Sequence, residues 1–232
     1  MQVREFRRLM EEVEDFPLQY FYDVRESILR IRVENTHLEE DELFDLRRSL
    51  ATIAGMVKIL NHSDEDDGHA EPEDGWRREK KYPYPALHRL SQNVMTFPQL
   101  IQRIDKILDK FGKIRDNATP ELLQIRRELA KTEGSISRTL YSILRTAQSE
   151  GVVEKDVTPT LRDGRLVIPV IPTLKRKIKG IVHDESATGK TVFIEPTEVV
   201  EANNRVRELE GEERKEIIRI LTEFTNKVRP FS

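Results

Sequence analysis

Two long stretches of the chain carry apolar residues at helical spacing, one on each side of a shorter stretch with strand-like composition. Between residues 119 and 149, apolar side chains recur every three or four positions from Leu122 to Ala147. Residues 197–228 repeat this pattern from Val199 to Val228. Each stripe is narrow and bordered by charged residues, as in a coiled-coil seam. Because a single β-rich segment connects the two stretches, we expect their helices to pair antiparallel.

The connecting residues predict a small antiparallel sheet. Its candidate strands are Val157–Arg162, Arg165–Ile171, Ile178–Asp184 and Lys190–Glu195. Asp163-Gly164 favours a type I′ hairpin turn, which needs positive φ at both central residues. Pro169 and Pro172 cannot donate to a ladder, so the second strand should lie at an edge or carry a bulge. A sheet this small needs the helix ends as support.

The first half of the chain predicts shorter helices. Thr36 and Glu39 fit a capping box, and Gly112 fits the residue that follows a helix. The predicted helices are Gln2–Glu14, Asp23–Arg32, one from the Thr36 cap to Leu60, Pro85–Asn93 and Pro98–Phe111.

These elements together predict a mainly α protein with a small β module, in the α+β class. We expect a helical core domain at residues 1–118 and an elongated antiparallel coiled-coil arm at residues 119–228. The arm consists of a helix at 119–150, a β tip at 151–196 and a helix at 197–228. Gly211 is expected to bend the last helix or loosen its packing.

Residues 63–85 interrupt the helical pattern and are rich in acidic side chains. They resemble a calcium loop only superficially. With Gly68 as the sixth residue, Ser63 and Asp74 stand where the loop requires Asp and Glu. We therefore predict a solvated, partly disordered acidic loop here, not a metal site, and assign no metal to His62 or His69.

Composition and charge limit the classes of function. The 232 residues carry a formal net charge of −3, so any site for a polyanion must be a local patch. The chain has no cysteine, which excludes disulfides, iron–sulfur clusters and thiolate zinc sites. No apolar run reaches the length of a membrane span. We expect a cytoplasmic protein with no membrane partner.

Such a patch lies within the β-rich segment. Between Lys155 and Lys190 there are eight lysines and arginines but four acidic residues. Four of the cations occupy a projected hairpin tip, where they could contact phosphates: Lys175, Arg176, Lys177 and Lys179. A solvated turn that merely keeps the protein soluble explains the same residues equally well.

Two further motifs suggest chemistry that their surroundings do not support. Gly189-Lys190-Thr191 resembles the end of a P-loop, but Asp184 stands where its first glycine belongs, and strand-forming residues follow in place of a helix. His183-Asp184-Glu185 resembles an acid–base cluster, yet no second group completes a catalytic set. We therefore predict no catalytic residue, no metal site and no cofactor within these residues.

Several longer motifs resemble the type-two branch of the MutS family. They follow one another in order over nearly the whole chain except the acidic loop. The motifs are Asp23-Val-Arg25, Ile114-Arg-Asp116, Ala118-Thr-Pro120, Leu123-Gln-Ile-Arg126, Gly164-Arg-Leu-Val-Ile-Pro169, Gly180-Ile-Val-His-Asp184, Ser186-Ala-Thr-Gly189, Phe193-Ile-Glu-Pro196 and Asn203-Asn204.

The resemblance implies a DNA-binding core, lever and clamp fragment that contacts the sugar–phosphate backbone of double-stranded or branched DNA, including recombination intermediates. The cations of the projected tip would make these contacts, with Arg162, Arg165 and Lys190 as outer support. Family members also carry an ATPase domain, which uses ATP and Mg²⁺, and often a nuclease domain. Neither is expected within this sequence.

Family members are linked to ribosomes as well, so the resemblance equally allows a structural interaction module that binds ribosomal RNA or protein. The full-length family protein forms a homodimer largely through its ATPase. The resemblance therefore leaves a monomer and a weak dimer both open for these residues.

Overall fold

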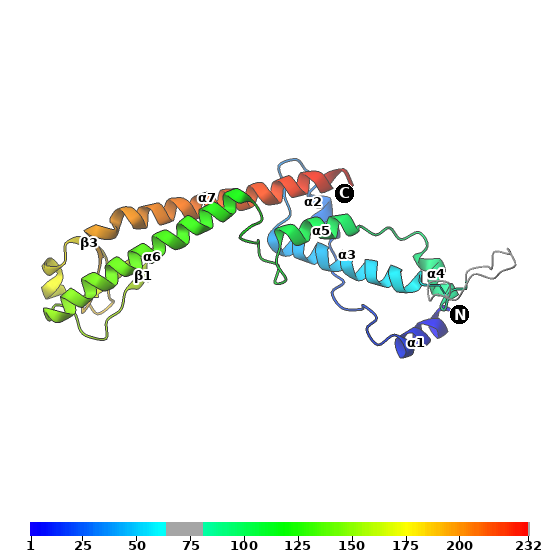
Figure 1. The fold of residues 1–232 in the computed structure, drawn as a ribbon, viewed down its shortest axis with the longest axis horizontal. Coiled ribbons are helices and arrows are strands. Elements are labelled where there is room, and N and C mark those ends of the chain that lie inside the picture. The colour runs from blue at the N-terminus through cyan, green and yellow to red at the C-terminus, as the bar shows by residue number, and fades with distance from the viewer. Residues whose placement is uncertain (64–80, 232) are drawn as a thin grey trace, which may run out of the picture. The chain divides into compact units, whose positions relative to one another are not determined.

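The chain forms two compact units built from helices and one small sheet (Figure 1). A computed structural model describes residues 1–63 and 81–231. The first unit comprises Met1–Arg115 with Leu221–Ser232, and the second comprises Asp116–Ile220. The α+β class is confirmed. Most of the predicted acidic loop, including its resemblance to a calcium loop, lies outside the described residues.

The first unit is helical. Its core lies largely between the third and fifth helices, where Leu43, Leu46 and Ile104 are buried. A second cluster joins Leu9 of the first helix to Leu87 of the fourth. The helices are α1 (Gln2–Glu12), α2 (Arg25–Arg30), α3 (Glu40–Leu60), α4 (Pro85–Ser91) and α5 (Pro98–Ile107).

Helix α3 begins three residues later than the predicted Thr36 cap requires. The cap is Glu39, whose backbone N–H donates to Glu42 Oε2 at 2.9 Å in a capping box. Thr36 instead donates to the carbonyl of Val33 at 2.7 Å. Residues 36–39 are not helical, and the N–H of Leu38 is bonded instead to Thr225 Oγ1 at 3.0 Å.

The predicted helix ending at Phe111 is also shorter in the structure. Helix α5 stops at Ile107, and Leu108 forms an isolated β-bridge with Ile114. Gly112 has the positive φ that its prediction required, at 80°, but it serves the turn between these bridge residues. A Cβ at this position would lie 2.6 Å from the ring of Phe44, so the turn also requires close packing.

Helix α7 (Val200–Val228) contributes its last two turns to the first unit. The hydroxyl of Thr225 accepts the N–H of Leu38, and Arg229 Nε donates to the carbonyl of Ile31 at 2.7 Å. Residues 221–228, which the sequence placed in the arm, therefore belong to the first unit, where Thr225 and the following Arg229 complete backbone hydrogen bonds.

In the second unit, α6 (Pro120–Ser149) and the preceding part of α7 form the predicted antiparallel pair. Thr119 caps α6 by accepting the N–H of Leu122, and it donates to Glu216. Two ion pairs cross between the helices, Arg126–Glu213 at 2.7 Å and Arg205–Glu128 at 2.9 Å. Because partners nearer the C-terminus of α6 lie nearer the N-terminus of α7, the helices run in opposite directions.

The sheet has four antiparallel strands in the order β1-β2-β4-β3. Asp163 and Gly164 have φ of 50° and 73°, which confirms the predicted hairpin turn. The pairing of β2 with β1 extends only to Val167, whereas Pro169 pairs with β4. The N–H that Pro169 lacks is therefore not needed for a hydrogen bond between β1 and β2. The strands are β1 (Thr160–Arg162), β2 (Arg165–Val170), β3 (Gly180–Glu185) and β4 (Val192–Pro196).

The sheet packs against the second half of α6 (Figure 1). Ile136, Leu140 and Leu144 of α6 share one core with Ile168 and Ile194 of the sheet. A small sheet has a single apolar face to bury, and the side of a helix covers more of that face than a helix end does.

No helix in the described ranges is both long and apolar enough to span a membrane.

Candidate nucleic-acid interface

The four cations of the predicted tip lie on a crossing connection and not on a hairpin. Strands β2 and β3 flank β4 on opposite sides, so the residues between them must cross the sheet. Most of this connection forms the 3₁₀ helix η1 (Pro172–Lys177). The prediction of a hairpin was wrong because it paired strands that are consecutive in sequence, whereas β4 inserts between them.

Apolar residues fix the connection to the core and leave its cations outside. Leu174 packs against the core cluster and Ile178 is buried within it. The N–H of Leu174 donates to the carbonyl of Ile171 at 2.9 Å. The N–H of Thr197 donates to the carbonyl of Lys179 at 3.0 Å. We call the four exposed residues between and beside these anchors the basic segment: Lys175, Arg176, Lys177 and Lys179.

The basic segment carries uncompensated charge. All four side chains are exposed, and none forms an ion pair with any residue in the ranges that the structure describes. Lys190, predicted as outer support, is likewise exposed and without an ion pair there. The sequence permitted a local excess of positive charge, and the fold leaves that excess open to solvent.

The two arginines predicted as outer support differ from Lys190. Arg162 stacks over the ring of Phe193 at 4.1 Å, and its Nε lies 3.8 Å from Asp184 Oδ2. Arg165 turns inward and donates to Glu195 Oε1 at 2.7 Å and to Asn204 Oδ1 at 2.5 Å. Its side chain is only 15% exposed, so Arg165 holds the fold together and is not directed at a ligand.

Glu195 is the centre of a buried polar network that the sequence analysis did not identify. Its carboxylate is fully buried and accepts from Arg165, from Asn203 Nδ2 at 2.8 Å and from the His183 ring at 2.5 Å. His183 reaches it because β3 bulges at this residue, between the pairs formed by Val182 and Asp184. The network joins three strands to the start of α7.

The network also determines the charge state of Glu195. Burial alone would raise the pKa of this carboxyl group, because it penalises the charged form. The hydrogen bonds from His183, Asn203 and Arg165 outweigh burial and lower the pKa below the ordinary value for glutamate. Glu195 is therefore a buried carboxylate that is ionised because its partners satisfy it.

A signal for this network was present in the sequence. Every residue of β4 is buried, and Glu195 is the charged member of that apolar run. A buried charge requires partners, and Asn203-Asn204 and Arg165 belong to motifs already noted. The connection to His183 depends on the bulge, which the sequence pattern does not reveal.

The structure offers no geometry for the chemistry that the smaller motifs suggested. Lys190 follows a tight turn in which the Gly189 N–H donates to the carbonyl of Ser186 at 2.8 Å. The chain then enters β4, where a P-loop would continue as a helix. His183, Asp184 and Glu185 lie along β3. Within the described parts of the chain, no group of three or more acidic or histidine side chains could hold a metal ion.

Comparison with known proteins gives a consistent family. No family model matches the chain. It is 32% identical to the Endonuclease MutS2 of Geobacillus sp. (strain WCH70) over 210 residues, which are 90% of this chain and 25% of that protein. It is 35% identical to that of Levilactobacillus brevis over 93% of this chain and 25% of the relative. For Gemmatimonas aurantiaca the identity is 32%, over 99% of this chain and 26% of the relative.

The chain thus spans about a quarter of the length of the curated relatives it matches. The matches extend over nearly all of its residues and include both units. Together with the ordered motifs from Asp23 to Asn204, they show that this chain belongs to the type-two branch of the MutS family.

Proposed function

We propose that this chain is the DNA-binding core and clamp region of a type-two MutS protein, and that its basic segment binds the sugar–phosphate backbone. The observation that carries the proposal is a set of four exposed cations without ion pairs in the described residues, anchored through Leu174 and Ile178. Cations in this state are free to replace the counterions around a phosphate chain.

The chemistry of the basic segment favours backbone contacts over base recognition. Lysine and arginine bound to phosphates fix position and give affinity, but they carry little sequence information. The segment has no aromatic ring on which a base could stack and no amide for adenine, and phosphates are a ligand that all four of its cations can share. We therefore infer sequence-nonspecific binding, with double-stranded or branched DNA as the ligand.

A salt titration tests the proposal. The basic-segment variant replaces all four cations by glutamine, and duplex and branched DNA are titrated by fluorescence anisotropy at several salt concentrations. For every phosphate that the variant no longer binds, the negative slope of log K against log salt should become shallower by about 0.9 on B-DNA. An unchanged slope would place the binding site elsewhere.

The control variant removes the same charge from exposed cations that are remote in sequence and form no ion pairs with described residues. It separates local contacts from the general effect of making the chain four charges more acidic. The control variant should keep the slope of the parent chain, and it replaces Lys58, Lys106, Arg214 and Lys215 by glutamine.

Ribosomal RNA would offer the same phosphate chemistry to the basic segment. Competition between branched DNA and ribosomal particles for the parent chain distinguishes the two ligands. If DNA is the ligand, an excess of ribosomal particles leaves most of the DNA bound. Efficient displacement would favour the ribosome-binding alternative.

The matched relatives are named endonucleases, but we assign neither nuclease nor ATPase chemistry to these residues. The motif that resembles a P-loop precedes a strand, and a phosphate-binding loop needs a helix N-terminus. A cytoplasmic location belongs to the same proposal. For the full-length family protein, we propose a homodimer in which the ATPase domain makes much of the contact.

A further inference from the structure

A second positive surface runs along the solvent-facing side of α6. The exposed cations Arg127, Lys131, Arg138 and Arg145 are separated by four, seven and seven residues. At 3.6 residues per turn these spacings place all four within an arc of about 40°. This arc lies opposite the face that buries Leu122, Ile136 and Leu140. We call these four residues the α6 stripe.

The charge of the α6 stripe is not compensated within the described structure. None of its four residues forms an ion pair there, and the one bond that Arg138 makes is to the carbonyl of Gly134 in its own helix. The nearest acidic residue of α6, Glu128, is already bonded to Arg205 of α7 at 2.9 Å. After Glu133, α6 contains no acidic residue.

The stripe does not contribute to helix stability. Arg127 and Lys131 are like charges four residues apart, an arrangement that costs an isolated helix a few tenths of a kcal/mol. The half-buried Arg205 of α7, by contrast, pairs with Glu128, Glu208 and Glu212. What distinguishes the stripe is that four such cations lie along one face of one helix, where they are available to an extended anionic ligand.

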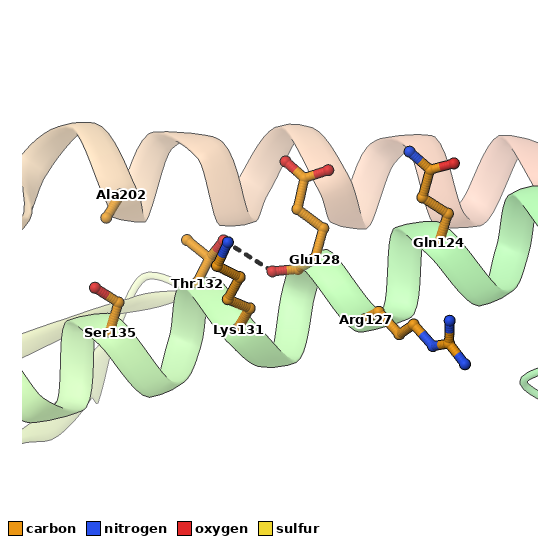
Figure 2. Close-up of a pocket in the computed structure, with 7 residues that line it drawn as sticks. All are labelled: Gln124, Arg127, Glu128, Lys131, Thr132, Ser135 and Ala202. Carbon is orange, nitrogen blue, oxygen red and sulfur yellow. Dashed lines mark hydrogen bonds between the residues drawn. The ribbon is translucent and has the colours of Figure 1, made fainter.

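A shallow groove of about 520 Å³ beside α7 adds neutral donors to the stripe (Figure 2). Arg127, Lys131, Gln124 and Ser135 all line it. In Figure 2, Gln124 and Glu128 point toward α7 while Arg127 extends away from it. Glu128 also lines the groove, but its carboxylate is bonded to Arg205. Gln124 and Ser135 belong to side-chain types that commonly donate to phosphates.

The dimensions of the stripe suit a duplex. From Arg127 to Arg145 the helix rises about 27 Å, which corresponds to about eight base pairs of B-DNA. Protein interfaces have an apolar core, but the stripe consists of charged residues interspersed with small polar ones such as Ser142 and Ser149. Interfaces with DNA are polar and strongly positive, which fits these residues better.

We infer that the outer face of α6 is a second DNA-backbone site, in which Arg127, Lys131, Arg138 and Arg145 contact phosphates of duplex DNA. This inference rests on the proposed function, because it adds contacts to the DNA that the basic segment binds. It differs from that function in its residues and in the element that carries them.

The test compares three glutamine variants with the parent chain in the salt titration: the α6-stripe variant, the basic-segment variant and the control variant. Replacement of the stripe should weaken duplex binding and reduce the magnitude of the salt slope by up to about 3.6, at about 0.9 for each of four contacts. Combining the stripe and basic-segment changes should reduce the slope further, since separated contacts add. Because the stripe has no structural partner, its variant should unfold at the same temperature as the parent or slightly higher.

The outcomes distinguish failure of this inference from failure of the proposed function. A stripe variant that keeps the slope of the control variant, while the basic-segment variant loses slope, overturns the second site alone. A parent chain that binds no duplex DNA overturns both. The same titrations with duplex RNA complete the test, because a stripe effect seen with RNA but not with DNA contradicts the assignment of the ligand.

Discussion

At the scale of single residues, charge in the β module serves two separate purposes. Glu195, Arg165 and His183 are turned inward and satisfy one another, so they fix strands and helix in place. Lys175 and Lys177 are turned outward and satisfy nothing within the described structure. Residue type alone does not separate these groups, since Arg165 and Arg176 are both arginines in a basic stretch.

Replacing Glu195 by glutamine tests the inward group. Glu195→Gln leaves Arg165 without its buried counter-charge, and removing one partner of a buried pair costs about 3 kcal/mol. Urea denaturation should show this loss in the free energy of unfolding. Glu185→Gln, on an exposed residue of the neighbouring strand, is the matched control and should change stability by less than about 0.5 kcal/mol. Equal effects of the two substitutions would contradict the structural role of the network.

The pH dependence of the same variant follows from the lowered pKa of Glu195. A carboxyl group with a lower pKa in the folded state stabilises the fold above the pKa of the unfolded chain, about 4.3 for glutamate. This contribution is lost as the pH falls through the folded-state pKa. The difference in unfolding free energy between the parent and Glu195→Gln should therefore shrink below about pH 4. A difference that stays constant into this acid range would contradict the assigned ionisation.

At the scale of elements, periodicity predicted the helices better than the connections. The apolar positions along α6 and α7 predicted that these helices pair, and Asp163-Gly164 predicted the first hairpin, because both signals are present in the local sequence. The crossing of η1 over β4 depends on strand order, which arises from packing between distant residues. The bulge at His183 also arises from that packing, so neither feature was available from pattern alone.

The pairing of β3 with β4 depends on one glycine. A Cβ at Gly180 would lie 2.1 Å from the carbonyl oxygen of Glu195, a backbone atom that cannot move without opening the ladder. Gly180→Ala should therefore destabilise the chain by about 3 kcal/mol, the upper part of the usual range for overpacking. Amide hydrogen exchange should show reduced protection in β3.

Gly134 provides the opposite case within α6. A Cβ there would meet no atom within 4 Å, and the position lies in the interior of a helix. Gly134→Ala should stabilise the chain by roughly 0.5–1 kcal/mol, because alanine loses less backbone entropy on folding. If Gly180→Ala raised the unfolding midpoint as Gly134→Ala is expected to, the close approach of Gly180 to the backbone of Glu195 would be contradicted.

At the scale of the whole molecule, function depends on where charge is placed and not on its total. The chain has a formal net charge of −3, yet two surfaces of the second unit carry cations without ion pairs in the described residues. The sequence identified the basic segment because its cations are nearly consecutive. It did not identify the α6 stripe, whose cations are four and seven residues apart and coincide only on a helix.

The most direct measurement of the central claim is lysine reactivity with and without DNA. The parent chain is acetylated under mild conditions, alone and saturated with duplex DNA, and modification at each lysine is quantified by mass spectrometry. Lys175, Lys177 and Lys179 should lose reactivity when DNA is bound, while the exposed control residues Lys58 and Lys215 keep theirs. Unchanged reactivity at the three basic-segment lysines under saturating DNA would contradict the claim that they hold the phosphate backbone.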